Sequence, residues 1–204
     1  MSRVPAGRVE PDLVYFSVDV EASGPVPGLY NLVSIGAVPV RRDGGRWRPV
    51  EDRFYVELKP ICEGFLPEAM AVHGIARERL ERDGVAAVEA LRGLTAFVGR
   101  HRRGGERAVF AGHNAVFDWS FISWYYVRSG IENPFGYKAL EVKSLAMGRL
   151  GIGWFETSKE NLQVLLPDLP VQDAAQVHRA DYDALYQAWI LCALLNLDSP
   201  RRGA

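Results

Sequence analysis

The sequence predicts one α/β domain in which helices flank a central mixed sheet of five strands. Strand-like segments come first and are followed by alternating helices and strands, an order typical of a mixed sheet covered by helices. The chain of 204 residues is long enough for one domain with a substantial core. A composition of 48% hydrophobic and 24% charged residues is that of a globular protein and excludes general disorder.

The expected strands follow from runs of alternating or continuous apolar residues. Residues 13–21 (LVYFSVDVE) alternate with a period of two and predict the first strand. Residues 32–40 and 53–58 predict two more, and the turn-rich segment 41–46 between them predicts an antiparallel hairpin. Shorter strands are expected at 107–112 and 140–142, which completes the predicted sheet.

Helical periodicity marks the remaining segments. Apolar residues three or four apart predict a helix over 85–98, and an aromatic-rich helix over 117–128 is ended by Gly130. We expect Ser144 to cap the helix after the last strand and Asp181 to cap a final helix over 182–197. Four aromatic residues spread all round the second of these helices, which favours the core over a base-stacking surface: Trp119, Trp124, Tyr125 and Tyr126.

Residues 12–198 are expected to form the domain, with flexible ends at 1–11 and 199–204. The N-terminus has no apolar segment typical of a signal peptide, and residues 184–197 are too short to span a membrane. Cys62 and Cys192 are far apart, which favours inert thiols in a reducing compartment. These features predict a cytoplasmic protein without a membrane partner.

The charge is nearly balanced, with 24 Lys and Arg against 25 Asp and Glu, and therefore excludes an overall basic surface. Net charge does not describe what one cleft binds, however. The segment from Arg100 to Arg107 is locally basic. We favour a solvated loop there, and a patch that binds nucleic-acid phosphates remains the alternative.

Two carboxylates lie on one face of the first strand. Asp19 and Glu21 occupy alternate positions, roughly 7 Å apart, because each residue of a strand rises about 3.3 Å. Burying two like charges raises a pKa or requires a cation. The break at Gly24 and Pro25 follows at once, and strand ends of this kind often bind ligands. A solvated strand face is the simpler alternative for this pair taken alone.

Asp118 is a third candidate, in the first turn of the helix that follows strand 107–112. Helix capping by Asp118 or Asn114 is an equally plausible function of this segment. A carboxylate directly after a strand end is also well placed to be a metal ligand.

His178 and Asp183 form the last candidate pair. Residues five apart cannot share one face of a regular helix, so we expect His178 on the loop and Asp183 in the first helical turn. A histidine on a loop suits general-base activation of a water. The alternative is a surface histidine beside a capping acid.

The four carboxylates together favour a metal centre over these separate alternatives. No Lys lies near them in the sequence to neutralise them, so two divalent cations are the expected counter-charge. Two metal ions about 3.5–4 Å apart bind the attacking and leaving oxygens in phosphoryl transfer. His178 would then accept the proton of the attacking water.

The order of these motifs resembles that of the DEDD exonucleases, histidine subgroup, which are the DnaQ-like 3′→5′ exonucleases. The resemblance runs from about residue 14 to residue 195, and each motif lies on an expected element. The matching segments are 16–24 (FSVDVEASG), 35–38 (IGAV), 72–75 (VHGI), 113–121 (HNAVFDWSF) and 178–183 (HRADYD).

The resemblance implies a ribonuclease H-like fold and two bound Mg²⁺ or Mn²⁺ ions. Asp19 would bridge the ions, Glu21 and Asp183 would bind the ion on the nucleophile side, and Asp118 would bind the other through water. His178 would be the general base. The residues implied to line the pocket for the 3′-terminal nucleotide are Ala22, Ser23, His73, Asn114 and Phe121.

Two segments depart from the family pattern. The usual Glu-Thr-Thr-Gly reads Glu-Ala-Ser-Gly here, so Ala22 lacks the hydroxyl that touches the terminal sugar. The loop 25–30 carries two prolines and is expected to be stiff. Both departures bear on the choice of substrate, and neither removes a metal ligand.

We therefore expect a 3′→5′ exonuclease that releases nucleoside 5′-monophosphates from single-stranded DNA or RNA. Two alternatives stay open: a catalytically silent module that binds nucleic acid or protein on the same fold, and a phosphohydrolase of small nucleotides. The sequence does not decide between DNA and RNA, nor whether the chain forms a homodimer as some relatives do.

Overall fold

A six-stranded mixed sheet forms the centre of the protein in the computed structural model, which describes residues 12–197. The expected flexible ends, 1–11 and 199–204, lie outside the described residues. The strand order is β3-β2-β1-β5-β6, and β4 also pairs with β2. The strands are β1 (Leu13–Ala22), β2 (Leu32–Asp43), β3 (Arg46–Pro49), β4 (Phe54–Glu57), β5 (Arg107–Gly112) and β6 (Ala139–Glu141).

The predicted mixed sheet is confirmed, with antiparallel pairing of β2 with β1, β3 and β4 and parallel pairing of β5 with β1 and β6. The sequence-based prediction of one hairpin over 32–58 is wrong in detail. Gly44 and Gly45, both with positive φ, connect β2 to β3, a strand that the sequence did not indicate. β2 is long enough to pair with β4 near its start and with β3 near its end.

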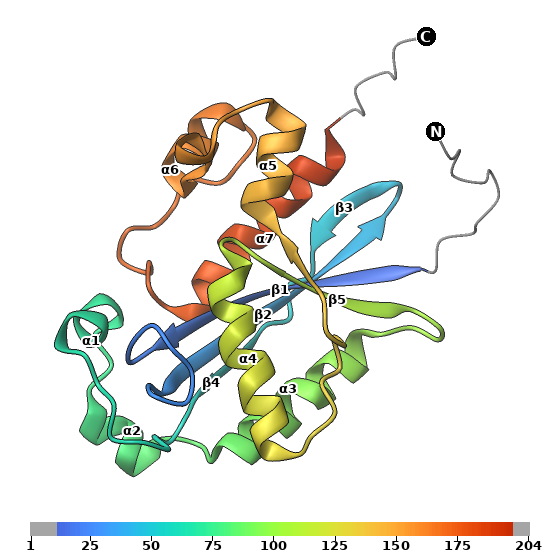
Figure 1. Cartoon of the computed structure of the whole chain (residues 1–204). Helices are drawn as coiled ribbons and strands as arrows, with labels where there is room; N and C mark the ends of the chain where they lie inside the picture. The colour runs from blue at the N-terminus through green and yellow to red at the C-terminus, as the bar shows by residue number, and fades with distance from the viewer. Residues whose placement is uncertain (1–11, 198–204) are drawn as a thin grey trace, which may run out of the picture.

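Helices cover both faces of the sheet (Figure 1). One hydrophobic cluster joins β1 to α3 (Ala87–His101) and α4 (Ala115–Ser129), with Phe16 and Phe97 in edge contact. A second cluster on the other face joins β2 to α5 (Val142–Leu150), α6 (Lys159–Leu165) and α7 (Ala180–Asn196). The three remaining helical segments are α1 (Pro67–His73), α2 (Arg77–Asp83) and the 3₁₀ turn η1 (Trp154–Thr157).

The predicted helices all exist, but their first residues differ from expectation. Ser144 lies inside α5, where Glu141 caps the helix by accepting a hydrogen bond from the Lys143 amide (2.8 Å). Asp181 lies in the first turn of α7, and Arg179 occupies the cap position. Both helices therefore start a few residues earlier than hydrophobic periodicity indicated.

Close packing of α7 on β2 depends on Gly36. A Cβ atom at this position would lie 2.0 Å from the Ala180 carbonyl oxygen and 2.4 Å from the Asp181 amide nitrogen. Gly36 is paired with Asp19 of β1 across the sheet. The absence of a side chain therefore brings the first turn of α7 against the strand pair that carries Asp19.

The aromatic residues of α4 belong to the core, as predicted. Tyr125 and Tyr126 are fully buried, and Trp119 and Trp124 pack against the same cluster. Of the two free thiols, Cys192 is buried and its pKa is raised to about 12 by burial, while Cys62 is only half-buried. Within residues 12–197, no helix combines the length and the apolar character needed to cross a membrane.

Candidate active site

Three elements converge where β1 ends: β1 itself, the first turn of α4 and the first turn of α7. Asp19 and Glu21 lie near the end of β1, and Asp118 lies in the first turn of α4. Asp118 Oδ1 accepts a hydrogen bond from the Val20 amide at 2.9 Å. This contact ties α4 to the strand between the two β1 carboxylates.

Of the two capping alternatives for the start of α4, side-chain capping by Asn114 is not observed. Asn114 is the N-cap residue, with a left-handed φ of 70°, but its side chain makes no capping hydrogen bond. Asn tolerates this conformation better than most residues. The left-handed bend turns the chain from β5 into α4 over two residues, His113 and Asn114, and so brings Asp118 next to β1.

His178 and Asp183 are positioned as the spacing predicts. His178 lies on an exposed turn with a φ of 66°, and Asp183 lies buried in the first turn of α7. The His178 amide donates to Asp183 Oδ2 at 2.6 Å. The helix residue thus fixes the backbone of the loop that carries the histidine.

The side chains meet in an open cleft of about 310 Å³. Asp19, Glu21, Asp118, Asp183 and His178 all line it. One potential ligand atom from each of Glu21, His178 and Asp183 lies within 4.8 Å of the others. Residues up to 164 positions apart in sequence therefore form one cluster of oxygen and nitrogen donors.

The expectation that no Lys neutralises these acids is wrong. Lys159, in the first turn of α6, contacts Asp183 Oδ1 through its ammonium group, and its side chain is only 20% exposed. Burial lowers the pKa of Lys159, but Asp19 and Asp183 outweigh burial and raise it above its usual value. The ammonium is therefore charged and offsets one of the four carboxylates.

Burial and mutual repulsion raise the pKa values of three of these acids, Asp19, Glu21 and Asp118. Burial raises the pKa of Asp19 well above its usual range, and Asp118 adds to this effect. Burial, with Asp183 and Asp118, raises the pKa of Glu21 to about 8. Burial likewise raises the pKa of Asp118 to about 7, although the Val20 amide opposes the shift.

This donor set fits divalent cations. Hard cations such as Mg²⁺ and Mn²⁺ prefer carboxylate oxygens, and a cation reverses the repulsion that raises these pKa values. Four carboxylates against one ammonium also leave the cleft acidic, so added positive charge is favourable. The residues that the sequence placed at a metal centre thus lie together in space.

The five residues expected at the nucleotide pocket are placed differently from one another. Asn114 lines the cleft, whereas Phe121 is fully buried and packs against Phe117, ring centroids 5.2 Å apart. Ser23 is also fully buried, and its hydroxyl donates to the Gly64 carbonyl (2.6 Å) and accepts from the Asn31 amide (2.8 Å). Phe121 and Ser23 therefore support the site from behind, and Phe117 is the aromatic residue at the cleft.

His73 is the last residue of α1, which comes after β4 in the chain and lies beside the loop that follows β1 (Figure 1). Its Nδ1 accepts a hydrogen bond from the Ile75 amide at 3.1 Å, and its Nε2 is buried without a hydrogen-bond partner among the described residues. Burial and the nearby His178 lower the pKa of His73, while the backbone of Ala22 acts in the opposite direction. The ring is therefore close to both His178 and the end of β1.

The basic segment from Arg100 to Arg107 lies away from the cleft. It precedes β5, and the cleft lies beyond the opposite end of that strand, after Gly112. Glu106 is buried and pairs with both guanidinium nitrogens of Arg41, at 2.7 and 2.5 Å. The arginines Arg100, Arg102, Arg103 and Arg107 are exposed, as expected of the predicted solvated loop, whereas Glu106 is buried.

Two supporting residues escaped the sequence analysis because their partners are distant in the chain. His113 donates its amide to Gln187 of α7 (2.6 Å) and its ring Nε2–H to the Thr157 carbonyl (2.8 Å). Gln187 in turn donates to the Val18 carbonyl of β1 (2.9 Å). Only the position of His113 at the start of the fourth matching segment, 113–121, signalled a function for it.

The chain resembles known proteins over nearly its whole length. Residues 14–195 match the family model described as the 3′-5′ exoribonuclease Rv2179c-like domain. The 3′-5′ DNA exonuclease Cap18 of Escherichia coli is 39% identical over 176 residues, which cover 86% of this chain and 88% of that protein. Ribonuclease T of Klebsiella pneumoniae is 29% identical over 183 residues, which cover 88% of this chain and 83% of that protein.

Solved structures share the fold at low sequence identity. The nuclease domain of 3′hExo, a DEDDh family member bound to rAMP, matches with a TM-score of 0.72 and 14% identity, over 89% of this chain and 91% of that one. Exonuclease I matches with a TM-score of 0.68 and 17% identity, over 93% of this chain and 42% of that one. The predicted ribonuclease H-like fold is thereby confirmed.

Proposed function

The chain belongs to the Rv2179c-like 3′-5′ exoribonuclease domain family and is a 3′→5′ exonuclease, and from this premise we propose its substrate and mechanism. It hydrolyses phosphodiester bonds at the 3′ end of single-stranded nucleic acid and releases nucleoside 5′-monophosphates. The observation that carries the proposal is the cluster of four carboxylates, of which Glu21, Asp118 and Asp183 are buried, beside His178 in an open cleft.

The four carboxylates would hold two divalent cations, Mg²⁺ or Mn²⁺. Asp19 would contribute to both positions, Glu21 and Asp183 to one, and Asp118 to the other. Bound cations of this kind supply a strong nucleophile at neutral pH and offset the charge of the attacking and leaving oxygens. The cluster supports this arrangement because its four acids lie in one cleft and the pKa values of Asp19, Glu21 and Asp118 are raised.

His178 would act as the general base. Its exposed ring is free to face substrate, while its backbone is held by Asp183. The ring accepts a proton from the attacking water as the water oxygen bonds to phosphorus. The bond from phosphorus to the 3′ oxygen of the preceding nucleotide breaks, and that oxygen takes up a proton.

The terminal nucleotide would be bound by Asn114, His73 and the backbone at Ala22 and Ser23, with Phe121 positioning Phe117 from behind. Ala22 has no hydroxyl, and the Ser23 hydroxyl is already bonded to Gly64 and Asn31. This segment therefore offers no free side-chain hydroxyl to a ribose 2′-OH, the group by which proteins distinguish RNA from DNA. We propose that the protein accepts single-stranded DNA and RNA alike.

The test uses DNA and RNA strands of one sequence, 5′-labelled, with Mg²⁺ or Mn²⁺. The wild-type protein should shorten both from the 3′ end at rates within about tenfold of each other. Asp19→Ala and Asp183→Asn should abolish cleavage, because four clustered carboxylates act as a unit. Asp168→Asn, an exposed residue outside the cleft, is the matched control.

If neither the DNA strand nor the RNA strand is cleaved, the proposal is contradicted, and a catalytically silent binding module is supported instead. Hydrolysis of mononucleotide esters without cleavage of strands would instead support a phosphohydrolase of small nucleotides. A preference of more than a hundredfold for one sugar would overturn the proposed acceptance of both.

A further inference from the structure

Two aromatic rings are exposed on the 3₁₀ turn η1. Phe155 is 92% exposed and Trp154 is 45% exposed. Neither ring is needed for the core clusters, which do not include them. Large exposed aromatic residues that lie next to one another often mark a binding surface.

Short hydrogen bonds hold the turn rigid. The Thr157 hydroxyl donates to the Trp154 carbonyl (2.6 Å), and the Gly153 amide donates to Glu156 Oε2 (2.8 Å). Thr157 is fully buried. The two rings therefore stand on a fixed support and lose little conformational freedom when a ligand binds.

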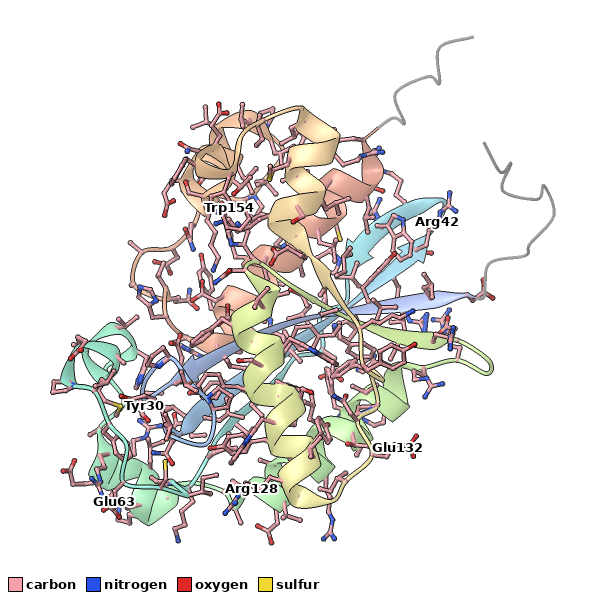
Figure 2. The ribbon with its side chains drawn as sticks, in the orientation of Figure 1. Tyr30, Arg42, Glu63, Arg128, Glu132 and Trp154 are labelled. Carbon is pink, nitrogen blue, oxygen red and sulfur yellow. The ribbon has the colours of Figure 1, made fainter. Side chains whose placement is uncertain are left out.

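The same turn is attached to the wall of the cleft. The Thr157 carbonyl accepts the hydrogen bond from the His113 ring, and His113 lines the cleft. Lys159, which reaches Asp183, follows the turn by two residues. Figure 2 shows Trp154 between α5 and α6, near the start of α4.

A cation lies beside the aromatic pair. The Lys143 ammonium is 4.0 Å from the centroid of the Trp154 ring, a distance typical of a cation–π contact. Lys143 belongs to the first turn of α5, whose cap residue Glu141 also accepts from the Asn114 amide at the cleft. Aromatic rings next to a basic side chain are the combination that binds single-stranded nucleic acid through base stacking and phosphate pairing.

The cleft is too small for more than a terminal unit. Its volume of about 310 Å³ is at the lower limit of small-molecule sites. The nucleotides that precede the scissile bond must then lie outside the cleft, on its rim. On the α5 and α6 side, the aromatic turn adjoins the cleft through the hydrogen bond between Thr157 and His113.

We propose that Trp154 and Phe155 form a stacking subsite for the bases that precede the last two nucleotides of the 3′ end, with Lys143 pairing with their phosphates. This inference rests on the proposed function and adds the path of the strand. The inferred subsite would make the protein prefer single strands several nucleotides long to dinucleotides as substrates. The subsite is independent of base identity, because every base has a face that stacks.

The test compares a 12-nucleotide strand with a dinucleotide of the same 3′ end. Phe155→Ala and Trp154→Ala should lower kcat/KM on the long strand roughly 5- to 100-fold, the effect expected when one stacked base is lost. The dinucleotide should be cleaved as by the wild type. Tyr137→Ala is the matched control: Tyr137 is 81% exposed beside Lys138 but precedes β6, at the end of that strand remote from the cleft.

Binding provides a second measurement that does not require cleavage. Fluorescence anisotropy of the labelled strand in the Asp183→Asn background should show weaker binding when Phe155→Ala is added. Quenching of tryptophan fluorescence by the strand should be smaller in Trp154→Phe. The inference is overturned by unchanged kcat/KM and binding, or by equal losses on the strand and the dinucleotide. If no substrate is cleaved at all, the proposed function fails, and anisotropy still decides whether the turn binds single strands.

Discussion

The ammonium of Lys159 contacts the carboxylate of Asp183, although the two residues are 24 positions apart and the loop between α6 and α7 lies between them. Asp183 is also bonded to the His178 amide through its second oxygen. One carboxylate thus holds a cation on one side and the candidate general base on the other. A metal ion that binds Asp183 must compete with an ammonium already present.

Lys159→Met should increase the affinity for Mn²⁺ several-fold, because it removes the competing positive charge from the acidic cleft. The same variant should lower the thermal stability of the metal-free protein, since the carboxylates then repel one another unopposed. Calorimetric titration with Mn²⁺ at constant pH measures the first effect. Lys138→Met removes an equal charge outside the cleft and should change neither quantity; weaker Mn²⁺ binding by Lys159→Met would contradict the prediction.

Gly36→Ala should disrupt the site, because a Cβ atom would overlap the backbone of α7 at Ala180. Displacement of the first turn of α7 moves Asp183 away from Asp19. We expect a loss of stability of about 1–3 kcal/mol, as is typical of overpacking, and a large loss of activity. Chemical denaturation measures the loss of stability, and cleavage of a 5′-labelled strand measures the loss of activity. Gly99→Ala, which meets no atom within 4 Å inside α3, should be neutral or stabilising.

His178→Asn should lower kcat by about 10²- to 10⁴-fold, the usual contribution of a general base. Affinity for Mn²⁺ should stay close to that of the wild type. This distinction matters because the His178 ring also lies within 4.8 Å of ligand atoms of Glu21 and Asp183. A tenfold or greater fall in Mn²⁺ affinity would show that the ring is a metal ligand instead.

The metal-free protein should lose stability as the pH rises through the neutral range. The pKa of Glu21 is raised from its usual 4.5 to about 8 and that of Asp118 from 3.8 to about 7, so the folded chain holds protons that the unfolded chain has released. Their stabilising contribution is complete below the unfolded values and disappears as the pH approaches 8.

Thermal unfolding in EDTA, at several pH values between about 5 and 8, measures this effect. Glu21→Gln removes one titrating group and should flatten the fall in Tm relative to the wild type. Glu132→Gln, an exposed substitution, serves as the control. A Tm difference between wild type and Glu21→Gln that is constant with pH would disprove the linkage. Because cations compete with these protons, Mn²⁺ should also raise Tm more at the higher pH.

Arg102→Ala combined with Arg103→Ala should leave the salt dependence of single-strand binding unchanged, because this loop lies at the end of β5 remote from the cleft. Lys143→Ala should reduce the slope of log K against log salt concentration by about one, as expected for the loss of one phosphate contact. Binding constants measured at several salt concentrations decide between them. If the salt dependence of binding is weaker in the arginine double variant, the strand contacts this loop, at the end of β5 remote from the cleft, and the prediction is wrong.

Local patterns were sufficient for much of the architecture and for the acids. Alternation in residues 13–21 placed Asp19 and Glu21 on a common strand, and the spacing of His178 and Asp183 placed one on a loop and the other in a helix. Such inferences succeed because strand and helix periodicity are properties of neighbouring residues. The same reasoning missed β3 and the shortest helices, which contain too few residues to show a period.

Contacts between distant segments were not accessible in this way. Lys159 has no local feature that marks it as a neighbour of Asp183, and nothing near Phe121 in the chain shows that the core covers it. The exposed rings of Trp154 and Phe155 are likewise connected to the cleft by a contact between distant residues, the hydrogen bond between Thr157 and His113.

The amino-acid order is therefore enough to predict the class of enzyme, which the relatives confirm, and to mark the four acids and the histidine as candidate site residues. Tertiary structure decides which charged and aromatic residues surround these candidates. The contacts that set these positions are the packing of α7 on Gly36 and that of η1 on His113. These packing contacts join residues 44 to 144 positions apart, and no local periodicity encodes distances of that kind.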